Sequence, residues 1–420
     1  MTATLDSLSY PSTDPIVITG LGAVCSLGNS IAEITRGLMS GKSGAQQITD
    51  FDAGELAFQA AQVKNPPAVK TDIHPQLART MGKHLSLLLP SIEEALDRAG
   101  IGSGMFDSRD IGFFAGMGMV DYHIEDLLPA VLKSLNQDGD LDYDRFFLSG
   151  YQEIYPLWPL GMLNNVAFCQ AAIHFCLRGE NCVFSPHGDA GIAAVSEAVK
   201  VLEEGKAKVA LAGGVGEQIS PFSLARARLK GLIRPPGENP GADIFLGEGG
   251  AMLVLEPLSG ALNRGADILG RIAGFGFSCH REEKPGCASR RAIASAIEGA
   301  LSQAALVPGR IDLIMAGSSS QNELEAVHEI FDTGGEAPVM VSAEAALGEI
   351  LAAGPILNAA IGLSIPDSTP FPFCPQSSVF RLLSGRPFGG SLHARRILVN
   401  GISYEGRCAS MIVEKVGETI

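Results

Sequence analysis

Aromatic and charged residues are both scarce in this chain of 420 residues, which has one tryptophan, 6% aromatic residues and 18% charged residues. Long hydrophobic runs are missing as well. No stretch of 18 consecutive apolar residues occurs, so no membrane-spanning helix is expected. Residues 1–14 lack a basic start followed by an apolar run, which argues against a secretory signal and indicates a tail. We therefore expect a cytoplasmic protein with no membrane partner.

Metal-binding patterns are missing too. The eight cysteines show neither CxxC pairs nor Cys/His spacing, and the histidines show no ligand spacing. In a cytoplasmic chain of this size the cysteines are expected to be reduced and mostly buried thiols. The sequence therefore predicts no metal and no cofactor.

Positive charge is in deficit. The chain has 31 Lys and Arg against 46 Asp and Glu, a formal net charge of −15. This balance disfavours nucleic acid as a partner, as well as an anionic membrane surface. An acidic carrier protein would have to dock on a local basic patch, or on a more basic partner.

Glycine, by contrast, is abundant, with 50 residues in a chain that is 46% hydrophobic, and this favours an α/β architecture with close backbone packing. Gly20 and Gly22 follow a predicted strand, as in the dinucleotide-binding fingerprint. The third glycine of that fingerprint would fall on Cys25, and no suitably spaced acid follows a second strand. We therefore do not expect a nucleotide site.

Segments of the first part of the chain recur in the second part in the same order, which indicates an internal duplication. The halves are residues 15–258 and 259–420, and short apolar strands buried on both faces predict two sheets with helices between and outside them. A segment of residues 121–162 has no counterpart, and its apolar composition indicates an insertion that covers an entrance or forms a subunit interface. The matched segments are 92–96 with 297–301, 109–116 with 310–317, 210–214 with 397–401, and 16–22 with 271–276.

Two stretches carry a resemblance to a known family. They are residues 15–44, PIVITGLGAVCSLGNSIAEITRGLMSGKSG, and residues 245–276, FLGEGGAMLVLEPLSGALNRGADILGRIAGFG, with a weaker match at 207–221. The chain resembles the elongating β-ketoacyl synthases of fatty-acid and polyketide assembly. The resemblance implies the thiolase fold, with two duplicated halves in five α-β-α-β-α layers, and an obligate dimer.

The family's catalytic centre uses a cysteine, two histidines and a lysine, and the resemblance places other residues at all four positions. Gly188 falls at the nucleophile, Gly317 and Gly348 at the histidines, and Ala343 at the lysine. One residue of slip would bring His187 to the nucleophile position. Decarboxylative condensation needs a thiolate to hold the acyl chain and donors for the oxyanion, so no catalytic residues are expected here.

The neighbouring positions are altered as well. The glycine-rich gating loop of the family reads Ser403, Tyr404 and Glu405 here. Asp189 is expected to be a helix cap. In the insertion, Leu157 and Trp158 are candidates for lining an acyl tunnel or a subunit interface.

Three functions remain open. The first is a subunit that resembles a chain length factor of type II polyketide systems, and the polyene-forming systems are one group to which it could belong. It would form a heterodimer with an intact ketosynthase, or a homodimer, and meet an acyl carrier protein, directly or through its partner. The second is a repurposed enzyme that uses His187, Asp189 or Glu349 for acyl transfer, hydrolysis or cyclisation; the alternative for His187 is a hydrogen-bonded structural histidine. The third is a regulatory acyl-binding pseudoenzyme.

Overall fold

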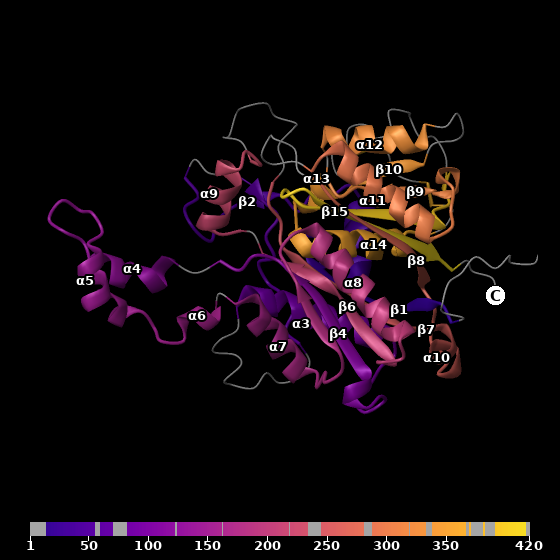
Figure 1. Cartoon of the computed structure of the whole chain (residues 1–420), viewed down its shortest axis with the longest axis horizontal. Coiled ribbons are helices and arrows are strands. Elements are labelled where there is room, and N and C mark those ends of the chain that lie inside the picture. The colour runs from indigo at the N-terminus through magenta and orange to yellow at the C-terminus, as the bar shows by residue number, and fades with distance from the viewer. Residues whose placement is uncertain are drawn as a thin grey trace, which may run out of the picture.

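A computed structural model gives the structure of residues 14–54, 59–69, 82–121, 124–161, 163–217, 219–233, 245–280, 288–318, 320–332, 338–366, 369–370, 381–382 and 391–416. In these residues strands and helices alternate, as the composition predicts (Figure 1). None of the helices described is both long enough and apolar enough to cross a bilayer.

The first half of the chain forms five strands of the central sheet, in the spatial order β5-β4-β6-β7-β1. Parallel pairs join β5 to β4 and β4 to β6, and antiparallel pairs join β6 to β7 and β7 to β1. The strands are β1 (Ile16–Cys25), β4 (Ile111–Met117), β5 (Asn181–Phe184), β6 (Val209–Gly216) and β7 (Gly249–Pro257).

The second half repeats this arrangement strand for strand, in the order β10-β9-β14-β15-β8, with β12 added beyond β10. The pairs are again parallel, parallel, antiparallel and antiparallel. The predicted duplication and the thiolase-like fold are therefore confirmed. The strands are β8 (Gly270–Cys279), β9 (Leu313–Met315), β10 (Val339–Ser342), β12 (Arg381–Leu382), β14 (Arg396–Ile402) and β15 (Arg407–Lys415).

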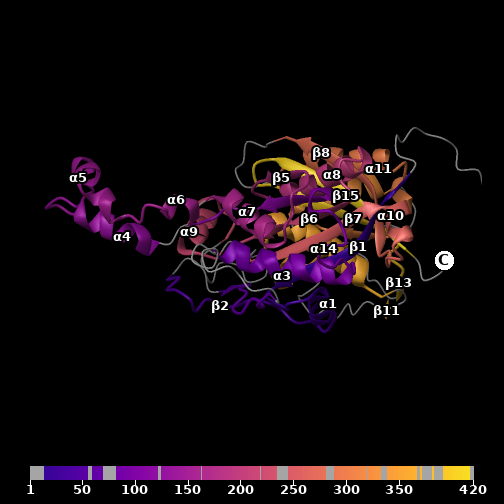
Figure 2. The ribbon, with the colours of Figure 1, turned by 90° about the horizontal axis from the view of Figure 1, so that it is seen from below.

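Helices lie between and outside the two strand sets, as predicted. The central helices α8 (Gly188–Glu203) and α14 (Gly354–Ser364) contact strands of both halves. The helices α3 (Lys83–Arg98) and α7 (Asn164–His174) cover one outer face, and α11 (Arg290–Gln303) and α12 (Gln321–Phe331) cover the other (Figures 1 and 2). The prediction of two separate sheets is wrong in one respect, because two residue pairs between β1 and β8 join the halves into one sheet of eleven strands.

Glycines let the outer helices lie directly on the strands, and they do so equivalently in both halves. A Cβ atom on Gly22 of β1 would overlap the carbonyl oxygen of Ser91 in α3. A Cβ atom on Gly276 of β8 would overlap the carbonyl oxygen of Ala296 in α11. Gly22, which resembles part of a nucleotide fingerprint in the sequence, therefore serves strand–helix packing.

The insertion forms an arm that projects from the body at the end opposite α10 (Leu258–Asn263) (Figure 1). The arm contains α4 (Ile124–Lys133), α5 (Tyr143–Leu148) and α6 (Trp158–Gly161). At its base, the carboxylate of Asp121 accepts a hydrogen bond from Arg226 at 2.9 Å. The hydroxyls of Ser220 and Ser223 donate to the same carboxylate, which ties the arm to α9 (Pro221–Leu229).

The remaining described elements are short and peripheral. The helix α1 (Ile31–Met39) follows β1 in the chain. Its N-cap residue Ser30 accepts a hydrogen bond from the backbone N–H of Glu33 at 3.3 Å. Others are α13 (Glu344–Leu347), the pair β2 (Gln46–Gln47) and β3 (Gln59–Ala60), the pair β11 (Thr369–Pro370) and β13 (Ser391–Leu392), and short 3-10 turns at Ser108–Asp110, Gly150–Glu153, Pro308–Arg310 and Leu351–Ala353.

The cysteines are less buried than expected. Six fall in the described residues, and all six are free thiols, as predicted. Only Cys25 and Cys408 are buried, so the expectation of mostly buried thiols is wrong. Burial raises the pKa of each of these two thiols to about 12, which makes them poor nucleophiles.

Gly22→Ala and Gly276→Ala should each lower the free energy of unfolding by about 1–3 kcal/mol, because the added methyl group must push an outer helix off its strand. Denaturant unfolding of the purified chain measures the effect. Gly102→Ala is the matched control, since no atom lies within 4 Å of a Cβ added there. Equal stability of all three variants would contradict the close-packing role.

Candidate functional site

The four positions at which the resemblance places catalytic residues lie around one small cavity. Its volume is about 40 Å³, and it lies between the first turns of the two central helices α8 and α14. Glu349, another candidate, also lines it. The other lining residues are apolar except Glu344 and Asn358; the lining comprises Gly188, Ala316, Gly317, Ala343, Glu344, Leu347, Gly348, Glu349, Ile350, Leu351, Gly354, Pro355, Leu357, Asn358 and Ile402.

Gly188 is the first residue of α8, which follows β5 and packs Ile192 and Val195 into the central core. A Cβ atom on Gly188 would lie 3.1 Å from the backbone nitrogen of Ile402 and 3.3 Å from the Cα atom of Gly401. The backbone of Gly188 is not left-handed, so a side chain here would be tight and not conformationally forbidden. The end of β14 thus occupies the space in front of the helix N-terminus.

Gly317 follows β9, and the backbone of β14 leaves less space for a side chain there than at Gly188. A Cβ atom there would lie 2.6 Å from the carbonyl oxygen of Asn400. The fully buried carboxylate of Glu323 fixes this approach, because it accepts hydrogen bonds from the backbone nitrogens of Gly317 at 3.0 Å and Ser318 at 2.7 Å. It also accepts one from the side-chain amide of Asn400 at 2.8 Å. Burial raises the pKa of Glu323, and these donors counteract the rise.

Gly348 and Ala343 flank the short helix α13. Gly348 has a φ of +71°, and a Cβ atom on it would lie 2.7 Å from the backbone nitrogen of Gly247. Ala343 is 2% exposed. Glu349 turns part of its carboxylate back onto its own loop, where Oε1 accepts a hydrogen bond from the backbone nitrogen of Leu351 at 3.2 Å.

His187 precedes α8 and is 4% exposed. Neither ring nitrogen has a hydrogen-bond partner within normal distance in the described part of the chain. Nε2 lies 3.8 Å from a carboxylate oxygen of Glu405, too far for a hydrogen bond, and the ring meets that of Tyr404 edge-on. Burial lowers the pKa of His187 to about 4, and the carboxylate of Glu405 opposes that shift.

Asp189 is the second residue of α8 and does not cap the helix, contrary to expectation. The N-cap is His187, and no side chain bonds there. The carboxylate of Asp189 instead accepts a hydrogen bond from Nε of Arg407 in β15 at 2.8 Å. Burial raises the pKa of Asp189, and Arg407 counteracts the rise.

The gate positions form a closed turn between β14 and β15. Ser403 is fully buried, and its backbone nitrogen donates to the carbonyl oxygen of Arg407 at 2.8 Å. The hydroxyl of Ser403 accepts a hydrogen bond from the backbone nitrogen of Glu405 at 3.1 Å. Tyr404 and Glu405 then lie over His187. Gly406, which ends this turn, is its one glycine and has a left-handed backbone with a φ of +92°.

Leu157 and Trp158 lie on the projecting arm and do not line the cavity at Gly188. Leu157 is 49% exposed, as an interface residue would be in an isolated subunit. Among the described residues, no group of three or more His, Cys, Asp or Glu side chains could hold a metal ion.

Sequence reasoning missed Glu323 and Arg407, although a signal for Glu323 was present. Ser320 and Glu323 form the Ser-x-x-Glu spacing of a helix N-terminus, and Ser320 is the N-cap of α12. The carboxylate reaches past the cap to Gly317 and Ser318. Arg407 has no such local signal, because its partner Asp189 is 218 positions away.

Comparison with known proteins gives the same family for the chain as the resemblance does. Residues 13–261 match the model of the β-ketoacyl synthase N-terminal domain. The chain is 26% identical over 374 residues to 3-oxoacyl-[acyl-carrier-protein] synthase 2 of Coxiella burnetii, which covers 84% of this chain and 86% of that one. It is 27% identical over 373 residues to the tetracenomycin polyketide synthase ketoacyl synthase beta subunit of Streptomyces glaucescens, covering 83% and 85%.

Solved structures share the fold. The ishigamide ketosynthase/chain length factor superposes with a TM-score of 0.76 at 23% identity, covering 96% of this chain and all of that one. A β-ketoacyl synthase from Burkholderia phymatum gives a TM-score of 0.77 at 22% identity, with the same coverage. The duplicated five-layer topology, the site at the start of α8 and the family match over more than half of the sequence lead to one conclusion. The chain belongs to the β-ketoacyl synthase family.

Proposed function

We propose that this chain is a non-condensing subunit, similar to a chain length factor, that pairs with an intact ketosynthase. In that pair it shapes the tunnel for the growing acyl or polyketide chain, in fatty-acid or type II polyketide biosynthesis. One observation carries the proposal. The positions at which the family resemblance places its nucleophile, histidines and lysine surround a single cavity of about 40 Å³, and they are Gly188, Gly317, Gly348 and Ala343.

The size of this cavity argues against an acyl chain bound at Gly188 in this subunit. A cavity of about 40 Å³ holds only a few water molecules. The space is taken by backbone, with the end of β14 against Gly188 and Gly317, and by apolar side chains such as Leu347 and Leu351. Holding and extending an acyl chain would require these elements to separate.

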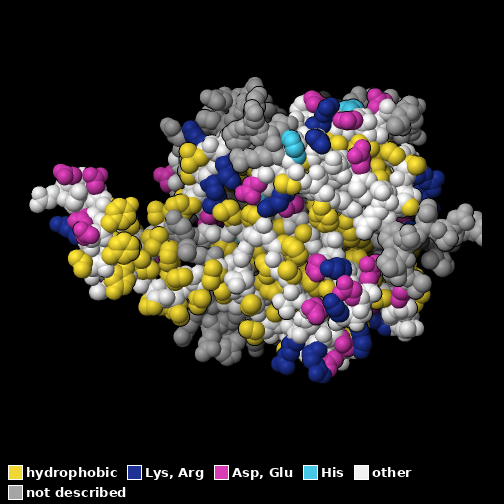
Figure 3. Space-filling view, viewed as in Figure 1, with side chains coloured by type: hydrophobic (Ala, Val, Ile, Leu, Met, Phe, Trp, Pro, Cys, Tyr) yellow, Lys and Arg dark blue, Asp and Glu magenta, His cyan; other side chains and the backbone are white. Residues whose placement is uncertain are grey.

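The projecting arm favours the presence of a partner subunit. Its large apolar side chains are exposed, and Figure 3 shows them gathered on the protrusion. A monomer rarely leaves so much apolar surface in contact with water, whereas subunit interfaces bury such clusters. The most exposed are Leu132 (58%), Tyr143 (67%), Phe147 (69%), Leu148 (77%), Tyr151 (51%) and Tyr155 (61%).

The strand β5 is an edge strand of the central sheet, with no strand on its outer side among the described residues. An edge of this kind can pair with a second chain. One similar protein is named as the ketoacyl synthase beta subunit of the tetracenomycin polyketide synthase, and one structure of the same fold is named as the ishigamide ketosynthase/chain length factor. An acyl carrier protein would reach the pair through the ketosynthase partner, since this chain carries a net charge of −15.

Gly188→Cys should not restore condensation. The new thiol would lie at a helix N-terminus, which favours a thiolate, but no donors would replace the histidines at Gly317 and Gly348. We expect slow self-acylation at most, seen as an adduct in the intact mass after incubation with acyl-carrier or acyl-CoA donors. The wild type should give no adduct near Gly188. Clear formation of a β-ketoacyl product by the variant, with no partner present, would overturn the proposal.

The double variant Phe147→Ser and Leu148→Ser should weaken assembly with an intact ketosynthase partner. Removing two large apolar contacts from an interface typically raises the dissociation constant at least about tenfold. Analytical ultracentrifugation of mixed subunits measures it. Leu262→Ser is the matched control, since Leu262 is 62% exposed on α10, at the other end of the molecule. A monomer in both the absence and the presence of the partner would contradict the pairing.

His187 supports a second candidate, an enzyme of changed chemistry. It is buried, its ring nitrogens are without partners in the described structure, and Tyr404 and Glu405 lie beside it. At neutral pH its lowered pKa keeps it uncharged, so it could accept a proton from a carrier-bound substrate. Thioester hydrolysis by the wild type that is lost in His187→Gln would favour this candidate over the first.

His187 should also make the protein acid-sensitive. The pKa of the imidazole falls from 6.5 in an unfolded chain to about 4 in the folded one. Between these values the unfolded state binds more protons, so the free energy of unfolding should fall by on the order of 3 kcal/mol as the pH is lowered. Urea unfolding from pH 7 to pH 4 should show this loss in the wild type and not in His187→Gln. Glu248, whose pKa burial raises to about 7, titrates equally in both proteins. The same pH slope in both would contradict the burial of a neutral imidazole.

A further inference from the structure

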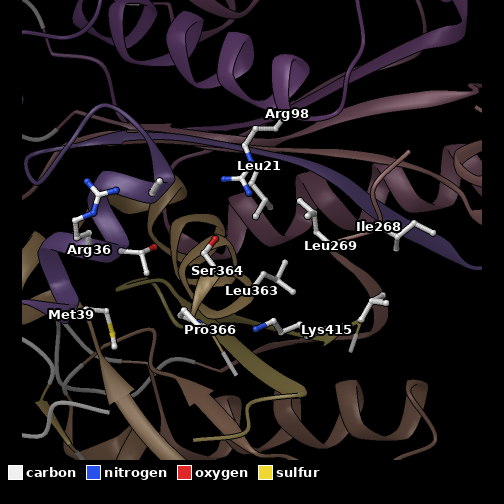
Figure 4. Close-up of a pocket in the computed structure, with 13 residues that line it drawn as sticks. Leu21, Arg36, Met39, Arg98, Ile268, Leu269, Leu363, Ser364, Pro366 and Lys415 are labelled. Carbon is white, nitrogen blue, oxygen red and sulfur yellow. The ribbon is translucent and has the colours of Figure 1, made fainter. Parts of the chain in front are cut away.

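A second and much larger hollow lies at the other end of the central helix α14. Its volume is about 660 Å³, which is in the range of sites for small molecules. It is built where α1, the end of α3, the start of β8, the end of α14 and the end of β15 meet (Figure 4). The lining residues are Leu21, Ala32, Thr35, Arg36, Met39, Arg98, Ile268, Leu269, Leu363, Ser364, Pro366, Lys415 and Val416.

This hollow is separate from the cavity at Gly188. Gly354 lines the small cavity at the N-terminal end of α14, and Ser364 lines the hollow at the C-terminal end. At 1.5 Å per residue, these two positions are about 15 Å apart along the helix. No residue lines both, so the hollow is not an extension of the candidate site.

The charge of the hollow is opposite to that of the protein. The chain has an excess of acidic residues, with 46 against 31 basic ones, yet the lining contains Arg36, Arg98 and Lys415 and no acid. In the described part of the chain, no carboxylate forms an ion pair with Arg36 or Arg98. Burial raises the pKa of Glu94, and the positive charge of Arg98 partly offsets that rise. The amine of Lys415 donates to the carbonyl oxygen of Ile365 at 2.5 Å.

Two hydroxyl groups of the lining are buried without a hydrogen-bond partner in the described structure. They are Oγ1 of Thr35, in a residue only 7% exposed, and Oγ of Ser364. Buried hydroxyls almost always have a partner, so these two are the hydroxyls of the lining that a bound polar group would satisfy. In the view of Figure 4, Ser364 lies between Arg98 and Lys415.

The rest of the wall is apolar. Leu21, Ile268, Leu269 and Leu363 line the side of the hollow away from Arg36 in Figure 4. Cations with open hydrogen-bonding positions bind a carboxylate or phosphate, and an apolar wall binds an alkyl chain. Charge complementarity and the two hydroxyls thus select an anion with a hydrophobic tail.

We propose that this hollow is a binding site for an anionic amphiphile, with a carboxylate or phosphate head group and an alkyl tail. The head group lies between Arg36, Arg98 and Lys415 and accepts hydrogen bonds from the hydroxyls of Thr35 and Ser364. The tail lies on the leucines and Ile268. This site does not depend on the proposed subunit role, because the two cavities share no residue.

Binding of decanoate and decyl phosphate, below their micelle concentrations, tests the site on the full chain by isothermal titration calorimetry. Decanol and decyltrimethylammonium are the neutral and cationic controls. We expect the two anions to bind and the controls to bind at least about tenfold more weakly, with affinity falling between 0.1 and 0.5 M salt. The stronger of the two anions identifies the head group. Equal binding of decanol would overturn the proposal.

Substitutions locate the binding. Arg36→Gln and Arg98→Gln should each weaken decanoate or decyl phosphate about tenfold. Arg290→Gln, at an exposed arginine on α11 that does not line the hollow, should have no effect and is the matched control. Unchanged affinity in the first two variants would place the ligand elsewhere and refute the site.

Thr35→Val separates binding from folding. Because the hydroxyl of Thr35 has no partner in the described structure, its replacement by a methyl group should leave the thermal midpoint of the free protein unchanged or higher. The same variant should show a smaller ligand-induced rise in that midpoint than the wild type. A lower midpoint without ligand, and an undiminished rise with it, would mean that the hydroxyl serves the fold and that the proposal is wrong.

Discussion

The closed centre of this molecule depends on one buried carboxylate. Glu323 accepts hydrogen bonds from the backbone after β9 and from the side chain of Asn400 in β14, and Asn400 in turn accepts one from Ser410 at 2.8 Å. A buried carboxylate that loses its donors is strongly destabilising, so β9 and β14 cannot separate without a large cost. The carbonyl oxygen of Asn400 is thereby held where a side chain on Gly317 would have to lie.

The duplicated fold places the N-terminal ends of both central helices at one cavity, so a few contacts are enough to close it. Both central helices start at the same small cavity, α8 at Gly188 and α14 at Gly354. The positive ends of two helix dipoles therefore meet there, an arrangement that favours an anion. In this chain Glu344 and Glu349 line that cavity, and Asp189 in the first turn of α8 pairs with Arg407, so the protein supplies its own negative charge near both helix ends.

The fold could be predicted from the sequence because its signals are local and repeated. Glycines two residues apart, at 20 and 22 and again at 274 and 276, mark strands that press on helices, and the repeat itself indicates two equivalent halves. The positions around the cavity could be placed by family resemblance. The orientation of their neighbours could not, because Asp189 meets Arg407 and Glu323 meets Asn400 only after distant strands have paired. The exposure of Cys169, Cys176 and Cys279 likewise depends on where α7 and β8 end up in the fold, which composition does not determine.

The packing around Gly317 and Gly348 limits which substitutions can be accepted at these positions during evolution. A side chain at either position would meet backbone atoms at 2.6 to 2.7 Å, and Gly348 also has a left-handed backbone. Introduction of a histidine at either position therefore requires a main-chain shift and a substitution together, and each change alone would be harmful. Under the proposed function, closure of the backbone around these positions would be difficult to reverse in evolution. Single substitutions could still change how the chain binds its synthase partner, but no single substitution could restore independent catalysis.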